Sequence, residues 1–207
     1  NCRVTRPFYR ISLIAAKLAE KGEVRRIDVK KIGSILASAA MALALMAGSA
    51  HAALITYNFT GTVQTIVTGT PLEGTFSLGQ SVSGSFVLDN SAADIDGDPG
   101  FGFFPGALTS ISVTIGGYVA SATGGSADTS NDFPSDSVFI AAAINSGPFA
   151  GSASVTGPSV GGLDLGLIGL QLQDSSSTAL ASDALPSPIT LSGFDSVFGL
   201  LDFYDPL

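Results

Sequence analysis

From residue 54 onward, apolar and polar residues alternate with a period of two, and this pattern is the strongest constraint on the fold. In residues 54–63 the odd positions are mostly large and apolar, while the even positions are mostly Thr and Asn. Neighbouring side chains of a β-strand point to opposite faces, so the pattern predicts a strand with one buried face. The alternation recurs, between segments rich in Gly, Pro, Asn and Asp, in residues 81–88, 111–115, 118–122, 138–144, 163–172 and 194–204.

Two local features refine this expectation. Gly116-Gly117 separates two alternating segments, and paired glycines accept the positive φ angles of a tight hairpin. Within residues 163–172 the apolar positions shift by one residue, which predicts a β-bulge near Gly166–Gly169. About eight to ten short strands joined by polar turns are typical of an all-β fold, an antiparallel β-sandwich or a jelly-roll-like domain. We expect one such domain over residues 53–207.

An uncharged apolar run, Ile32 to Ala52, precedes this domain. Lys30-Lys31 lies before it, and Ala50-His51-Ala52 closes it with small residues at the positions that signal peptidase requires. The pattern predicts a helical signal peptide with cleavage after Ala52. A run of this length also fits an uncleaved membrane anchor, and the Ala- and Ser-rich composition with the A-x-A ending favours cleavage.

The segment before the apolar run has no initiating methionine, because the first Met in the sequence is Met41. We interpret residues 1 to about 23 as translated upstream sequence or a fragment edge, since a signal peptide needs only a short basic region before its apolar segment. The predicted organisation is an upstream segment plus signal peptide over residues 1–52 and a single domain over residues 53–207.

Charge divides the chain at the same point. All nine Lys and Arg residues lie before residue 53, whereas 14 of the 17 acids lie after it. Nucleic acids and anionic lipids are bound through Lys and Arg, so the acidic part is not expected to bind either. The only Cys and the only His also lie before residue 53, which excludes disulfides and histidine chemistry from the predicted domain.

The densest candidate site is the acidic segment 89–100. Asp94, Asp96 and Asp98 have the D-x-D-x-D spacing that directs alternate carboxylates at Ca²⁺. Asp132 and Asp136 belong to a second acidic segment, which is expected to lie beside the first. The first acidic segment, 89–100, is not an EF-hand, because Pro99 stands where an EF-hand has Gly after the third Asp. Calcium ligation and simple solvated turns both remain open, since Asp, Asn and Gly are also ordinary turn residues.

Catalytic groups are scarce after residue 52. A pair of carboxylates, as in a glycosidase, is the only familiar scheme that remains, and Glu73 lies in a predicted turn without an evident partner. The composition therefore predicts a protein that is not an enzyme. Phe101, Phe103 and Phe104 follow the acidic segment, and core packing is favoured for them over an exposed aromatic surface that would bind sugar or a partner.

Several segments resemble bacterial PEP-CTERM sorting-domain proteins. They are residues 55–63, 82–86, 104–110, 113–117, 131–132, 136–138 and 182–186. The resemblance covers most of residues 53–205 and implies a secreted β-rich domain that an exosortase sorts to the cell surface or extracellular matrix, often in exopolysaccharide-producing bacteria. It brings no catalytic residues. The family's carboxyl-terminal tail, with its Pro-Glu-Pro motif, hydrophobic helix and basic end, is not part of the 207 residues.

Together these features predict a secreted, non-enzymatic protein at the surface or in the matrix of a Gram-negative bacterium. The expected partners are an extracellular polysaccharide or other matrix proteins, with no nucleic acid and no membrane for the domain itself. The alternative is a calcium-dependent polysaccharide-binding module, and a more distant one is an acid glycosidase.

Overall fold

The structure is a computed structural model, and it describes residues 8–20, 54–132, 134–144 and 153–206. The predicted signal peptide lies outside these residues. No helix in the described ranges is long and apolar enough to cross a membrane. Within β1, side chains are described only for residues 10–13.

In the part of the chain that the structure describes, strands account for almost all of the regular structure, and two short 3-10 helices, Pro71–Gly74 and Leu191–Gly193, interrupt them. The described strands are β1 (Phe8–Glu20), β2 (Leu54–Ile66), β3 (Ser81–Asp89), β4 (Phe101–Pro105), β5 (Leu108–Ile115), β6 (Tyr118–Thr123), β7 (Ser126–Ser130), β8 (Asp136–Ala143), β9 (Ser154–Thr156), β10 (Asp164–Asp174) and β11 (Ser196–Tyr204).

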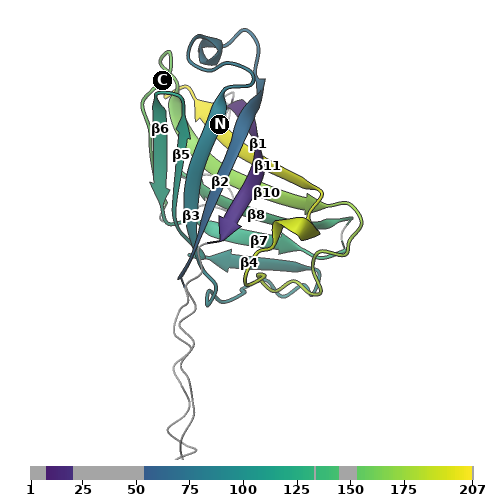
Figure 1. Cartoon of the computed structure of the whole chain (residues 1–207). Coiled ribbons are helices and arrows are strands. Elements are labelled where there is room, and N and C mark those ends of the chain that lie inside the picture. The colour runs from purple at the N-terminus through teal and green to yellow at the C-terminus, as the bar shows by residue number, and fades with distance from the viewer. Residues whose placement is uncertain (1–7, 21–53, 133, 145–152, 207) are drawn as a thin grey trace, which may run out of the picture.

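All of these strands belong to one antiparallel sheet, in the order β4-β7-β8-β10-β11-β1-β2-β3-β5-β6-β9. The sheet curls strongly and forms two arms. The arm made of β2, β3, β5 and β6 crosses in front of the arm made of β4, β7, β8, β10 and β11, which we call the β4–β11 arm (Figure 1). The all-β prediction is confirmed. The finer expectation of a two-sheet sandwich or jelly roll differs from what is found, because β1 and β11 connect the arms through continuous ladders.

The core lies between the two arms, on the concave face. β2 contributes Tyr57, Phe59 and Val63, which are the odd-numbered apolar positions of the alternation. The rings of Tyr57 and Phe86 stack with centroids 4.8 Å apart, and offset aromatic pairs of this kind stabilise beyond their buried area. Ile140 and Leu170 close the core from the opposite arm.

Both predicted local features are confirmed. Ile115 pairs with Tyr118 across the turn at Gly116-Gly117, and Gly116 has φ +58°. The ladder between β10 and β11 shifts register between Leu165 and Leu167, which places the bulge at Gly166.

One strand has an unexpected origin. β1 comes from the segment upstream of the predicted cleavage site, yet it lies inside the sheet between β11 and β2. Ile11 and Leu13 are buried in the core. In the chain as given, residues 8–20 therefore form part of the same body as residues 54–206. The predicted boundary at Ala52 falls outside the described residues and stays a prediction.

A candidate binding trough on the outer sheet face

The outer face of the β4–β11 arm carries a row of side chains that crosses five adjacent strands. The register of the ladders pairs each member of the row with a member on the neighbouring strand. The row consists of Phe103, Asp128, Phe139, Gln171 and Phe198. All five are partly exposed. Because neighbouring strands lie about 4.8 Å apart, the row is roughly 19 Å long. We call it the aromatic row.

The next row along the strands consists of short side chains where it crosses β7, β8 and β10, namely Ser126, Ala141 and Gly169. A Cβ atom at Gly169 would lie 3.2 Å from Cε2 of Phe139, so the Phe139 ring packs over this glycine. On the far side of these small residues lie the longer side chains of Leu167 in β10 and Arg10 in β1. The surface is therefore hollowed between two taller rows.

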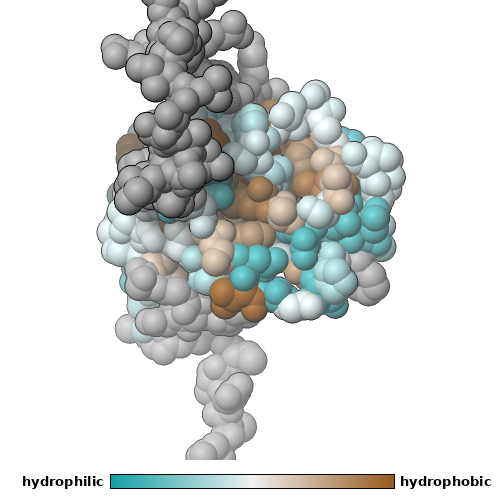
Figure 2. All heavy atoms as spheres, turned by 90° about the horizontal axis from the view of Figure 1, so that it is seen from below, coloured by the Kyte–Doolittle hydropathy of each residue, from teal (hydrophilic) through white to brown (hydrophobic). Residues whose placement is uncertain are grey.

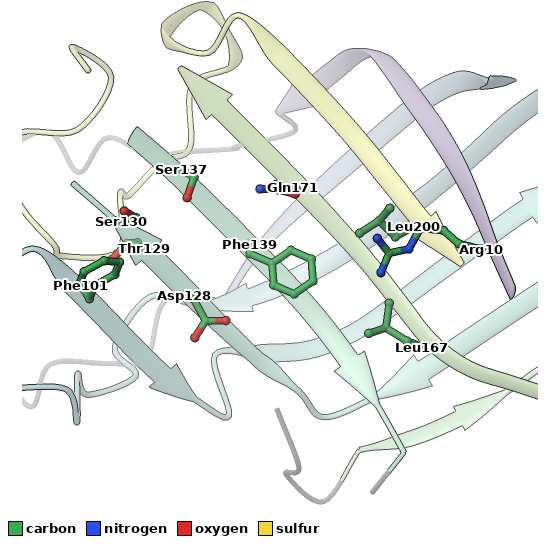
Figure 3. Close-up of a pocket in the computed structure, with 10 residues that line it drawn as sticks. All are labelled: Arg10, Phe101, Asp128, Thr129, Ser130, Ser137, Phe139, Leu167, Gln171 and Leu200. Atoms are coloured by element: carbon green, nitrogen blue, oxygen red, sulfur yellow. The ribbon is translucent and has the colours of Figure 1, made fainter. Parts of the chain in front are cut away.

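This hollow is a pocket of about 470 Å³, which we call the trough (Figure 3). Its walls combine two Phe rings, a carboxylate, an amide, hydroxyl groups and a guanidinium group, a mixture of apolar and polar groups that is typical of ligand sites. When the molecule is seen from below the view of Figure 1, apolar residues lie at its surface among hydrophilic ones (Figure 2). The trough is lined by Arg10, Phe101, Asp128, Thr129, Ser130, Ser137, Phe139, Leu167, Gln171 and Leu200.

Asp128 is the only acidic residue of the trough lining. Its Oδ2 atom is buried and has no hydrogen-bond partner among the residues that the structure describes. Because burial disfavours the charged form of an acid, it raises the pKa of Asp128 from its usual value near 3.8 to about 7. Near neutral pH the carboxyl group can therefore either donate or accept a hydrogen bond.

Arg10 closes the other end of the trough and is held by Asp202. The Nε and Nη2 atoms of Arg10 donate to the two carboxylate oxygens of Asp202 at 2.8 and 3.1 Å, a bidentate geometry that favours a planar pair. The hydrogen bond to Asp202 raises the pKa of Arg10 further. The ion pair thus fixes a cation at the trough edge.

Three of the five predicted calcium ligands form successive turns. Asp94 accepts hydrogen bonds from the backbone N–H groups of Asp96 and Phe103, both at 2.9 Å. Asp96 accepts from the N–H of Asp98 at 3.0 Å, and Asp98 from that of Gly100 at 2.9 Å. Each carboxylate therefore uses an oxygen to fix the loop.

The other two predicted ligands lie at the start of β8. Asp136 is buried, and its two oxygens accept the N–H groups of Asp132 and Leu180 at 2.9 and 2.7 Å. The two acidic segments meet, as expected, where the N–H of Asn131 donates to the carbonyl of Gly100. Within the described ranges, however, no three acidic, His or Cys side chains converge so as to hold a metal ion. Calcium binding stays a prediction.

The three aromatic candidates that follow the acidic segment lie on different faces of β4. Phe104 is buried in the core, as favoured, whereas Phe101 and Phe103 are partly exposed on the outer face of β4. Glu73 lies in the first 3-10 turn, as predicted, and accepts a hydrogen bond from Gly69 N–H at 3.0 Å. Sequence reasoning missed Phe139, Gln171 and Phe198, because alternation shows that they face outward and not that they adjoin.

No family model matches the chain, and neither a curated protein nor a solved structure is similar enough to match it.

Proposed function

We propose that this protein is a secreted, non-enzymatic component of the cell surface or extracellular matrix that binds an extracellular polysaccharide in the trough. The aromatic row is the observation that carries the proposal. Phe139 lines the trough, and Phe103 and Phe198 continue its row on either side, so that the row supplies apolar ring surface along the path of successive sugar rings. Asp128 and Gln171, which lie between the rings, supply donors and acceptors for sugar hydroxyl groups.

The length and openness of the row fit an extended chain better than a single small molecule. At roughly 19 Å it is longer than one sugar ring, and it runs across strands of a rigid sheet rather than over loops. A sheet of this kind keeps its side chains in fixed positions, so little ordering cost is added on binding. The polysaccharide is expected to run across the strands from β4 towards β11.

The lining also supports a binding role over hydrolysis. Glycosidases of the common types use two carboxyl groups on either side of the scissile bond. Asp128 is the single carboxyl group among the ten residues that line the trough. A lone carboxyl group with a pKa near 7 suits hydrogen bonding to hydroxyl groups, and it lacks the second partner of a retaining or inverting mechanism.

The test is binding of the full chain to a panel of soluble bacterial polysaccharides, measured by affinity electrophoresis and calorimetry. We expect Phe139→Ala and Gln171→Ala each to weaken binding about tenfold, since a lost ring or amide contact contributes about 1 kcal/mol or more. Val119→Ala, an exposed residue of β6 on the other arm, is the matched control and should bind normally. Circular dichroism confirms that each variant is folded.

Two further experiments distinguish this proposal from a calcium-dependent module and from a glycosidase. Binding that disappears in EDTA and returns with Ca²⁺ would favour the calcium-dependent module. Release of reducing sugar that stops in Asp128→Asn would favour a glycosidase. If no polysaccharide binds, or if Val119→Ala and Phe139→Ala bind alike, the trough is not a glycan site.

A further inference from the structure

β1 is joined to its neighbour in an unusual way. Glu20, the last residue of β1, pairs with Tyr57 in β2, so the two strands form an antiparallel pair. Such pairs are usually connected by two to five residues. Here residues 21–53 intervene in the sequence, and they contain the predicted cleavage site after Ala52. The covalent link between β1 and the remaining sheet is therefore the part of the chain that processing would cut.

The position of β1 makes it difficult for the rest of the sheet to close without it. β1 is antiparallel both to β11, with Ile11 opposite Leu201, and to β2, with Ile11 opposite Ile66. β2 and β11 consequently run parallel to each other. Without β1, they would have to form a new parallel ladder or present two facing edges, and unpaired edges are templates for a further strand.

The space that β1 occupies has a defined shape. Ile11 is fully buried and Leu13 is 3% exposed, so both fill the core between the arms. Leu13 lies opposite Gly199 in β11, and a Cβ atom at Gly199 would lie only 2.9 Å from the Cβ of Leu13. The glycine thus makes room for an apolar side chain at this position of the inserted strand.

The site also requires a positive charge. Asp202 is 6% exposed and is neutralised by Arg10 of β1 through the bidentate pair. Residues 53–207 contain no Lys, Arg or His, so no side chain in that part of the chain can replace Arg10. A buried carboxylate that loses its cation is strongly destabilising. A second copy of residues 53–207 has no cationic side chain to offer either.

From these observations we propose that the slot between β2 and β11 is a strand-acceptor site, and that after residues 1–52 are removed it binds an extended segment of a different protein. The segment carries Arg or Lys opposite Asp202 and apolar residues at the positions of Ile11 and Leu13. Main-chain hydrogen bonds to both neighbouring strands provide the affinity, and these three side chains provide the specificity. The inserted strand also restores the cationic end of the trough.

The experiment uses the full chain with a specific protease site introduced within residues 21–53. After cleavage, β1 remains in place without a covalent link. A fluorescent peptide of residues 7–21 is then added, and exchange is followed by anisotropy and by size-exclusion chromatography. We expect the peptide to replace the resident strand in a one-to-one complex, while an Arg10→Glu peptide and a Leu13→Asp peptide each bind at least about tenfold more weakly.

A charge reversal distinguishes specific insertion from general stickiness. In the cleaved chain carrying Asp202→Arg, the Arg10→Glu peptide should bind better than the unmodified peptide. An unrelated alternating peptide with Arg at the same position should compete, and its Glu counterpart should not. The proposal is overturned if no peptide exchanges into the cleaved chain, if the Arg10→Glu peptide binds as tightly as the original, or if the cleaved chain dimerises and excludes the peptide.

Discussion

At the scale of single residues, Asp128 gives the clearest pH dependence. Its pKa is about 7 in the folded state because of burial, against about 3.9 for an unfolded Asp. Between these values the folded state binds more protons than the unfolded state, so the free energy of unfolding falls as pH rises from about 4 to about 7. We expect wild type to lose more stability between pH 5 and pH 8 than Asp128→Asn, which cannot ionise. Urea unfolding at both pH values measures the difference.

Asp96→Asn is the control for this prediction, because Asp96 is exposed and lies outside the trough. This variant keeps Asp128, so it should still lose stability between pH 5 and pH 8. Parallel curves for wild type and Asp128→Asn would mean that the carboxyl group is not buried in solution.

Asp174 is expected to behave in the opposite way. It accepts five hydrogen bonds, from Ser176 N–H and Oγ, from Thr178 N–H and Oγ1, and from Ala179 N–H. The hydroxyl bond from Ser176 and the backbone bond from Thr178 are the main reasons that the pKa of Asp174 lies well below its usual range. Its stabilising contribution is present above about pH 4, the unfolded value, and is lost as pH falls towards the lower folded value.

Asp174→Asn should therefore melt at a lower temperature than wild type at pH 7, and the gap should narrow as pH falls towards 3. Differential scanning calorimetry across this range measures both effects. Ser176→Ala removes the hydroxyl hydrogen bond that lowers the pKa of Asp174 most, and it should reproduce part of the loss in melting temperature. Equal melting of Asp174→Asn and wild type at pH 7 would show that the loop does not depend on this carboxylate.

At the scale of elements, close approach of strands makes one glycine sensitive. Gly84 of β3 pairs with Phe59 and with Val113, and a Cβ atom there would lie 2.2 Å from the Ser112 carbonyl oxygen and 2.3 Å from Cζ of Phe59. Overpacking of this kind costs roughly 1–3 kcal/mol. We expect Gly84→Ala to lower the free energy of unfolding by about that amount, measured by urea denaturation.

Gly97→Ala is the matched control. A Cβ at Gly97 would meet nothing within 4 Å, and its φ is not in the left-handed region. This variant should be close to wild type in stability. If both substitutions cost the same, the loss at Gly84 would come from propensity and not from contact with Phe59.

The strands that alternation could reveal are those with one wet face. β2, β3, β5 and β6 were predictable for this reason, and so were β8, β10 and β11. β7 was not predictable, because its Ser126, Thr129 and Ser130 are buried although they are polar. β4 was hidden among consecutive Phe residues, and β1 lies upstream of an apparent processing signal. Polar residues become buried here through neighbours that are distant in sequence, and no local pattern records that.

The candidate site was less accessible from the sequence than the fold. Phe103 and Phe198 are 95 positions apart in the numbering and join one row only through four successive ladders. A shift of one residue in any ladder would turn a member of the row to the other face. The acidic segment, by contrast, is obvious in the sequence, and its carboxylates fix turns. The cluster of acidic residues in the sequence therefore marked a loop, whereas the trough results from the register of strands that are far apart in the sequence.

At the scale of the whole molecule, the difference between one sheet and two depends on a few pairings. Alternation defines which side chains face the core, and it is the same whether the arms are separate sheets or halves of one curled sheet. β11 decides between them, because it pairs with β10 on one side and β1 on the other. Continuity therefore depends on residues 8–20, and the fate of β1 after processing concerns the architecture of the whole molecule.

Charge acts at the same scale. Residues 53–207 carry 14 acids and no Lys or Arg, so the folded domain is subject to self-repulsion that salt screens. We expect the melting temperature of the full chain to rise as NaCl increases from about 20 to about 200 mM, where the Debye length is under about 10 Å. If Asp94, Asp96 and Asp98 only fix turns through their backbone N–H partners, Ca²⁺ and Mg²⁺ at equal concentration should raise the melting temperature equally. Calorimetry in matched buffers measures these shifts. A larger rise in Ca²⁺ that Asp96→Asn abolishes would contradict this expectation and establish the calcium site that the D-x-D-x-D spacing predicts.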